Sequence, residues 1–237
     1  MNFIKSSRYD NSFIMENMMG PNSMKLLEEL MASIQLEKGM RVLDLGCGKG
    51  LTSVFLAKEF GVQVFATDLW ITATENYQRF RAMGLEPEII PIHADALSLP
   101  YADEFFDAVV SIDSYHYFGR DPHYMDEKLA PLLKKGGMIA LAFPGLKEEL
   151  EQEIPKEFAF SWTAEDVAEW HSCEWWKALL EQSNEITTQA VSEMEGFEEC
   201  WNDWLSCANE YALGDRAAME AGAGKYMNFV SVIARKK

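Results

Sequence analysis

The chain has 237 residues, of which 48% are hydrophobic and 25% charged, and its formal net charge is −17. This composition predicts a globular protein with one substantial core, organised as a single domain with an elaboration. So large a negative charge disfavours binding to DNA or RNA, because proteins gain most of that affinity from cationic contacts with phosphates.

No apolar run approaches the roughly 20 residues that span a bilayer, and residues 1–12 lack the apolar centre of a signal peptide. We therefore expect a cytoplasmic protein without a membrane partner. The cysteines show no C-x-x-C spacing, so we expect reduced thiols and neither a zinc site nor a disulfide framework. They are Cys47, Cys173, Cys200 and Cys207. No metal-binding cluster is evident elsewhere in the sequence, so no metal is expected.

The first 21 residues hold aromatic and methionine side chains without a sustained period, which predicts an arm or flap. Residues 22–36 carry apolar side chains on one helical face, which predicts a helix that covers a sheet. That face consists of Met24, Leu27, Leu30, Met31 and Ile34.

The segment from Arg41 to Gly50 has the sequence RVLDLGCGKG. Its apolar side chains predict a buried strand over 40–46 that ends in a glycine turn. Asp44 lies inside this strand, and a buried carboxylate is costly unless a cation or a hydrogen-bond donor meets it. The glycine spacing is neither that of a P-loop nor the dinucleotide pattern G-x-G-x-x-G, so phosphates are disfavoured as ligands.

Asp68 ends the next predicted strand, 62–68, where an acid can accept hydrogen bonds from ribose hydroxyls. Together, Asp44, the glycine turn and Asp68 predict a site for a nucleoside that carries a positive charge and no phosphate. S-Adenosylmethionine meets this description. We expect Cys47, between the glycines, to be a small neutral filler.

Predicted strands and helices alternate through the first half of the chain. Such alternation implies a parallel sheet with helices on both faces, whose ligands bind at the carboxyl ends of the strands. The predicted strands are 40–46, 62–68, 87–93 and 105–113, and the predicted helices are 50–60, 71–83 and 121–133.

The second half of the chain predicts a fifth strand at MIALAF, then two helices capped by Thr163 and Ser172, a strand near 186–193, a helix over 196–213 and a last strand over 226–234. Four tryptophans fall between the fifth strand and residue 186. Aromatic side chains at helical spacing usually pack in a core, and the alternative is an aromatic pocket for an ammonium group. The four are Trp162, Trp170, Trp175 and Trp176.

Four ordered segments resemble class I S-adenosylmethionine-dependent methyltransferases, closest to the small-molecule branch of sarcosine, phosphoethanolamine and ubiquinone-type enzymes. They are VLDLGCGKG with Asp68, HADALSLP at 93–100, FFDAVVSIDSYHYF at 105–118 and LLKKGG at 132–137. The resemblance implies an α/β fold with a Rossmann-like, mostly parallel seven-stranded sheet, helices on both faces, an antiparallel last strand and a helical lid insertion. It also implies methyl transfer from S-adenosyl-L-methionine to a small-molecule acceptor, with release of S-adenosyl-L-homocysteine.

The same resemblance divides the chain into an arm or flap (1–21), a cofactor-binding core (22–145), a lid (146–185) and a segment that completes the core (186–237). It implies that Asp44 binds the ammonium group, that Asp68 binds the ribose and that Asp95 with the Ala96 amide recognises adenine. Leu69 and Trp70 would wall the adenosine pocket, although Trp70 can instead be a helix-start residue packed on the sheet. The remaining cofactor contacts are implied at Gly46, Cys47, Gly48, Gly50 and Asp113.

Residues after the fourth strand line the methyl-transfer site in related enzymes, so the candidate catalytic residues are Asp113, Tyr115 and His116. His116 is either a base or positioning group, or a hydrogen-bonded wall. His93 is expected to be a structural histidine. The implied substrate contacts are Tyr9, Tyr117, His171 and Trp175.

Two rivals stay open. One is a non-catalytic module that keeps the cofactor pocket and uses the Trp-rich segment to bind a partner. The other is a lipid enzyme of the cyclopropane-synthase type, which would need a long apolar channel. The identity of the acceptor stays open, and a monomer or a homodimer is expected.

Overall fold

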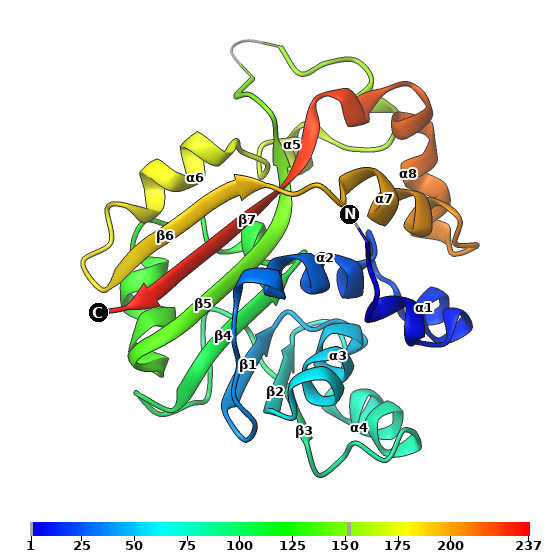
Figure 1. The fold of residues 1–237 in the computed structure, drawn as a ribbon. Helices are drawn as coiled ribbons and strands as arrows, with labels where there is room; N and C mark the ends of the chain where they lie inside the picture. The colour runs from blue at the N-terminus through cyan, green and yellow to red at the C-terminus, as the bar shows by residue number, and fades with distance from the viewer. Residues whose placement is uncertain (1, 151–152) are drawn as a thin grey trace.

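The computed structural model describes residues 2–150 and 153–237. Within these residues, seven strands form one sheet in the order β3-β2-β1-β4-β5-β7-β6 (Figure 1). β1 to β5 pair in parallel, whereas β7 is antiparallel to β5 and β6, so the predicted Rossmann-like sheet is confirmed. The strands are β1 (Arg41–Leu45), β2 (Gln63–Asp68), β3 (Ile89–His93), β4 (Phe106–Ile112), β5 (Leu133–Leu146), β6 (Ile186–Glu193) and β7 (Met227–Lys236).

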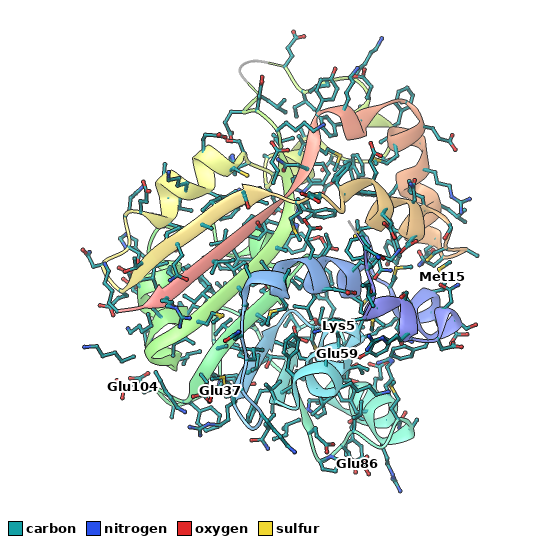
Figure 2. All side chains as sticks on the ribbon, viewed as in Figure 1. Lys5, Met15, Glu37, Glu59, Glu86 and Glu104 are labelled. Atoms are coloured by element: carbon teal, nitrogen blue, oxygen red, sulfur yellow. The ribbon has the colours of Figure 1, made fainter. Side chains whose placement is uncertain are left out.

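The sheet separates two hydrophobic cores, because successive side chains of a strand point to opposite faces. Val42 and Val64 point into the core under α2 (Ser23–Leu30), α3 (Leu51–Phe60) and α4 (Ala73–Ala82). Leu43 and Phe65 point into the other core, under α6 (Cys173–Leu180) and the short turns η3 (Tyr115–Tyr117), η4 (Met125–Leu129) and η5 (Ala130–Leu132). Side chains fill the space between these layers (Figure 2).

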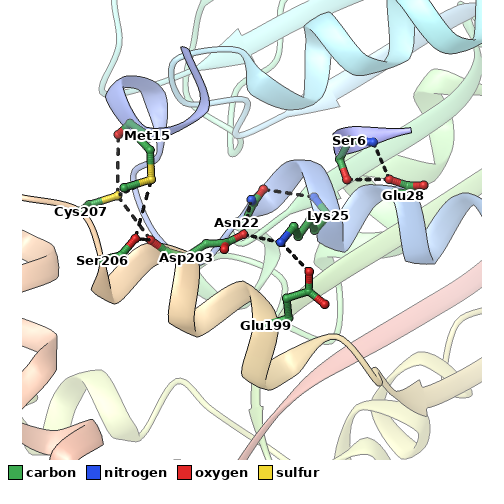
Figure 3. Close-up of polar contacts among 9 residues, drawn as sticks. All are labelled: Ser6, Met15, Asn22, Lys25, Glu28, Glu199, Asp203, Ser206 and Cys207. Atoms are coloured by element: carbon green, nitrogen blue, oxygen red, sulfur yellow. Dashed lines mark hydrogen bonds and ion pairs between the residues drawn. The ribbon is translucent and has the colours of Figure 1, made fainter. Parts of the chain in front are cut away.

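The first residues of the chain are packed on the domain. η1 (Ser6–Arg8) and α1 (Asn11–Asn17) precede α2, and the side chains of Phe3, Ile14 and Met18 are buried. The Glu28 carboxylate of α2 accepts hydrogen bonds from the Ser6 amide at 2.7 Å and the Ser6 hydroxyl at 2.6 Å (Figure 3). The predicted arm is therefore a fixed part of the fold in this structure.

The predicted helix over 121–133 is wrong. The chain there forms the π-helical turn η4 followed by the 3₁₀ turn η5. Pro131 lies in η5 and has no N–H to donate to a carbonyl one turn earlier, so a regular helix cannot continue through it.

The predicted helix over 196–213 is divided into α7 (Phe197–Leu205) and α8 (Glu210–Glu220). Asn209 caps the N-terminus of α8, because its side-chain oxygen accepts a hydrogen bond from the Ala212 amide at 2.9 Å. The predicted caps Thr163 and Ser172 are confirmed at α5 (Ala164–Val167) and α6.

We predict that Asn209→Ala lowers the free energy of unfolding by about 1 kcal/mol, because the first turn of α8 loses its cap. Urea denaturation measures this change. Asn202→Ala on the exposed face of α7 is the matched control, and it should change stability by less than about 0.5 kcal/mol. Equal losses for both variants would contradict the assigned cap.

Candidate functional site

A cavity that is partly open to solvent lies at the carboxyl ends of β1, β2 and β4. Its walls come from the glycine turn after β1, the β2 end with residues 67–70, the turn 94–96, and residues 112–114 with 117 and 118. A further wall comes from the N-terminal part of the chain, at Asn17, Met19, Gly20, Pro21 and Ser23.

The glycine turn brings bare backbone to the cavity. Gly46, Gly48 and Gly50 have φ angles of 73°, 52° and 84°, which side chains rarely tolerate. A Cβ atom on Gly46 would lie 1.9 Å from the Ser114 hydroxyl oxygen, so only glycine fits there. Burial raises the pKa of the Cys47 thiol well above its usual value, which keeps it neutral as expected.

Asp44 lies beneath this turn. Its side chain is fully buried, and it is not among the described residues that line the cavity. Its Oδ2 accepts hydrogen bonds from the hydroxyls of Thr52 at 2.7 Å and Ser53 at 2.6 Å, whereas Oδ1 has no partner among the described residues. Burial raises the pKa of Asp44 to about 6, and the two hydroxyls oppose this shift.

Asp68 lines the cavity and connects two of its walls. Its Oδ2 accepts a hydrogen bond from the Gly48 amide at 2.8 Å, and its Oδ1 accepts from the amides of Trp70 and Ile71, each at 2.8 Å. Because a carboxylate oxygen has two lone pairs, Oδ2 keeps one acceptor position that these contacts do not use.

Leu69 and Trp70 form the rim of the cavity. Trp70 is 67% exposed, and its ring meets that of Tyr117 edge-on with 5.6 Å between centroids. It is therefore a cavity residue, and the alternative in which it packs on the sheet is wrong. His93 forms a hydrogen bond through Nε2 with the Leu69 carbonyl at 2.8 Å, as expected of a structural histidine.

Asp95 and Ala96 line the cavity at the end of β3. Asp95 is exposed, and its Oδ1 accepts a hydrogen bond from the Leu97 amide at 2.8 Å. The Tyr124 hydroxyl donates to the Ala96 carbonyl at 3.1 Å, which fixes this turn on the second core.

Asp113 follows β4 and also lines the cavity. Its φ angle of 59° is unusual for a residue with a side chain, and such strain tends to collect at functional sites. A Cβ atom on Gly20 would lie 2.1 Å from Asp113 Oδ2, so the Gly20 backbone rests directly on the carboxyl group. Burial and the nearby charge of Asp215 raise the pKa of Asp113 to about 8.

Tyr115 and His116 do not occupy the predicted site. They turn inward with η3, so only Tyr117 of this turn reaches the cavity. Tyr115 is fully buried against Phe143 and Trp176. Burial lowers the pKa of His116 to about 3, so its imidazole is neutral. These positions do not support the catalytic roles predicted for the two residues.

The other predicted substrate contacts also lie outside the cavity lining. Tyr9 packs on Phe55, and its hydroxyl donates to Glu59 at 3.1 Å. His171 stacks on Trp175 with 3.7 Å between ring centroids, and its Nδ1 lies 3.0 Å from Glu149. These contacts hold the side chains of Tyr9, His171 and Trp175 away from the cavity.

The tryptophans of the predicted lid pack mainly in the protein interior, as the core interpretation predicted. Trp176 is fully buried, Trp170 is 8% exposed, and Trp162 packs against the first core. No described residue of 146–185 lines the cavity, which is covered instead by residues 17–23. Residues 1–21 were predicted as an arm or flap, and the Gly-Pro pair at Gly20 and Pro21 indicates a turn there without showing which wall of the cavity it meets.

No helix among the described residues is long and apolar enough to cross a membrane. The same residues contain no cluster of three or more His, Cys, Asp or Glu side chains suited to a metal ion.

We predict that the Asp113 carboxyl titrates near pH 8, measured by the chemical shift of its carboxyl carbon. Because this folded-state value exceeds the ordinary 3.8, the fold favours the protonated form, and stability is lost as the pH rises from about 4 to about 8. Asp215→Asn should lower the midpoint by removing a repelling charge. Asp107 is the internal control, since Lys134 and Arg41 lower its pKa against the effect of burial. A midpoint for Asp113 below pH 5 would contradict the assignment.

Comparisons with known proteins agree with this architecture. Residues 42–137 match the family model described as a methyltransferase domain. The chain is 34% identical over 119 residues to methyltransferase GfsG of Streptomyces halstedii, which is 50% of this chain and 42% of that protein. It spans less than half the length of the curated relatives that head this comparison.

Two solved structures share the fold. Phosphoethanolamine N-methyltransferase 2 of Haemonchus contortus, solved with S-adenosyl-L-methionine, has a TM-score of 0.74 at 20% identity and covers 99% of this chain and 59% of its own. The [4+2]-cyclase SpnF has a TM-score of 0.67 at 17% identity, over 97% of this chain and 94% of its own. These matches show that residues 42–137 form a methyltransferase domain, and the described chain shares the fold of the two solved structures.

Proposed function

We propose that this protein transfers a methyl group from S-adenosyl-L-methionine to a small-molecule acceptor and releases S-adenosyl-L-homocysteine. The observation that carries the proposal is the single cavity that Asp68, Asp95 and Asp113 line together with the bare backbone of the glycine turn. The fold alone is not sufficient, because the cyclase SpnF shares it.

The residues present fit this cofactor. Gly46 presents bare backbone beside Ser114, where a Cβ atom would not fit, and Asp68 Oδ2 retains a free acceptor position for a hydroxyl. One oxygen of Asp44 has no hydrogen-bond partner in the described part of the chain, and burial raises the pKa values of Asp44 and Asp113, so a cationic ligand would stabilise their ionised forms.

Each of these residues has a proposed task. The glycine turn would hold the methionine portion, Asp68 the ribose, and Asp95 with the Ala96 amide the adenine. Asp44 would act through its charge from beneath the turn, because its carboxylate is one layer removed from the cavity. When bound, the cofactor supplies an electrophilic methyl group on a sulfonium.

Asp113 is the proposed catalytic residue in place of His116. A neutral, buried imidazole cannot exchange protons with an acceptor, whereas the Asp113 carboxyl faces the cavity. An acceptor amine that arrives as an ammonium group would pass one proton to the Asp113 carboxylate, which frees the nitrogen lone pair for attack on the methyl group. The Trp70 and Tyr117 rings at the rim also suit a cationic acceptor.

The cytoplasm remains the proposed location, and the free thiols of all four cysteines support a reducing compartment. A monomer or a homodimer remains the proposed assembly.

The function is tested by incubating the protein with S-adenosyl-L-methionine and a panel of small amines, alcohols and thiols while S-adenosyl-L-homocysteine is measured. Release with at least one acceptor is expected. Cofactor binding without release from any acceptor would favour the non-catalytic module. Asp68→Asn should weaken cofactor binding more than tenfold in calorimetry, since a charged acceptor for buried hydroxyls is lost. Unchanged affinity would contradict the role of Asp68.

We predict that Asp113→Asn lowers kcat about 100-fold, because the amide cannot accept the proton, and leaves the affinity for S-adenosyl-L-homocysteine within a few-fold. The pH dependence of kcat should flatten in this variant. Tyr115→Phe is the control, since it removes only a buried hydroxyl outside the cavity, and its kcat should stay near that of the wild type. A wild-type rate for Asp113→Asn would remove Asp113 from the mechanism.

A further inference from the structure

Residues 17–23 form a covering segment over the cavity, between α1 and α2. The segment touches two walls of the cavity. The Gly20 backbone rests on the Asp113 carboxyl, and the Met19 side chain reaches the glycine turn, where a Cβ atom on Gly48 would lie 3.1 Å from Met19 Sδ. The position of this segment therefore determines how closely the cavity is covered.

The covering segment is held at one end by Asn22. The Asn22 side chain is 2% exposed, and its Nδ2 donates to Asp203 Oδ2 of α7 at 2.7 Å. The Asn22 amide donates to the Cys200 carbonyl of the same helix at 3.1 Å. Lys25 lies 2.7 Å from the same Asp203 oxygen and 2.6 Å from Glu199 Oε1 (Figure 3).

At the other end, Met15 of α1 contacts the residues that follow α7. The Cys207 thiol lies 3.7 Å from the Met15 carbonyl oxygen and 3.8 Å from Met15 Sδ, and the Ser206 hydroxyl lies 3.8 Å from the same sulfur (Figure 3). Helix α7 and its C-terminal end thus hold the covering segment on both sides, although neither Asp203 nor Cys207 is among the described residues of the cavity lining.

Helix α7 is itself anchored. The Trp204 indole donates to Asp215 of α8 at 2.8 Å, and the Arg216 guanidinium donates to the carbonyls of Leu205 at 2.7 Å and Cys207 at 3.0 Å. These contacts fix the end of the helix that meets the covering segment.

We infer that Asp203 and Asn22 are positioning residues, which hold the covering segment down on Asp113 and the glycine turn and so set how fast a ligand leaves the cavity. The inference rests on the proposed function, because the ligand is the proposed cofactor or its product. It assigns control of ligand exchange to α7, outside the segment of the methyltransferase family match.

The test compares Asp203→Ala with Glu199→Ala. Each variant removes one carboxylate partner of Lys25 from the same helix, but only Asp203→Ala removes the contact with Asn22. In the ligand-free protein, amide hydrogen exchange at Met18, Met19, Gly20 and Asn22 should become about tenfold faster in Asp203→Ala and stay within about twofold of the wild type in Glu199→Ala. The dissociation rate of S-adenosyl-L-homocysteine, measured in a displacement experiment, should also rise about tenfold in Asp203→Ala and stay within about twofold of the wild type in Glu199→Ala.

Gly20→Ala disturbs the segment from the cavity side and leaves α7 intact, so it also tests the inference if Asp203→Ala folds poorly. It should speed ligand dissociation by a similar factor. Equal exchange and equal dissociation rates in Asp203→Ala and Glu199→Ala would overturn the inference, as would an unchanged dissociation rate in Gly20→Ala. If the wild type binds no S-adenosyl-L-homocysteine, the proposed function fails, and the exchange comparison still decides whether Asp203 holds the segment.

Discussion

The Asp68 carboxylate accepts hydrogen bonds from the backbone amides of Gly48, Trp70 and Ile71, and the shape of the cavity depends on these contacts. They join the turn after β1 to the turn after β2 at the edge where parallel strands end. The Thr67 carbonyl adds hydrogen bonds from the amides of Gly46 and Cys47. Backbone groups that a loop would otherwise leave to water are thus paired within the site, which keeps the glycine turn in one conformation.

The site concentrates negative charge where burial makes charge costly. Asp44 and Asp113 both have raised pKa values because burial disfavours their ionised forms. The surroundings of the two carboxyls differ. Hydroxyls of α3 donate hydrogen bonds to Asp44, whereas Asp113 lies on a backbone with a positive φ angle. A cation in the cavity would stabilise the ionised carboxylates of Asp44 and Asp113, so the site favours a positively charged ligand.

Local pattern was sufficient to predict most of the core. The β6 strand agrees with the strand predicted near 186–193, and the glycine turn follows β1 as its spacing predicted, because strand alternation and glycine turns are local properties. The sequence did not separate Tyr117, which lines the cavity, from Tyr115 and His116, because the direction of each side chain depends on the 3₁₀ turn that follows β4. The sequence predicted an arm or flap over residues 1–21, but not that Gly20 rests on Asp113, because that contact comes from tertiary packing that no sequence period reports.

The hydrogen bond between Asn22 and Asp203 joins residues separated by 181 positions in the chain. Such a contact forms only after nearly the whole polypeptide has been made, since α7 must exist before it can receive the segment that precedes the sheet. While the chain is being synthesised, the parallel strands can assemble before residues 17–23 cover the cavity. A chain truncated before α7 would therefore lose the residues that hold this cover, together with β7, the strand that joins β6 to β5.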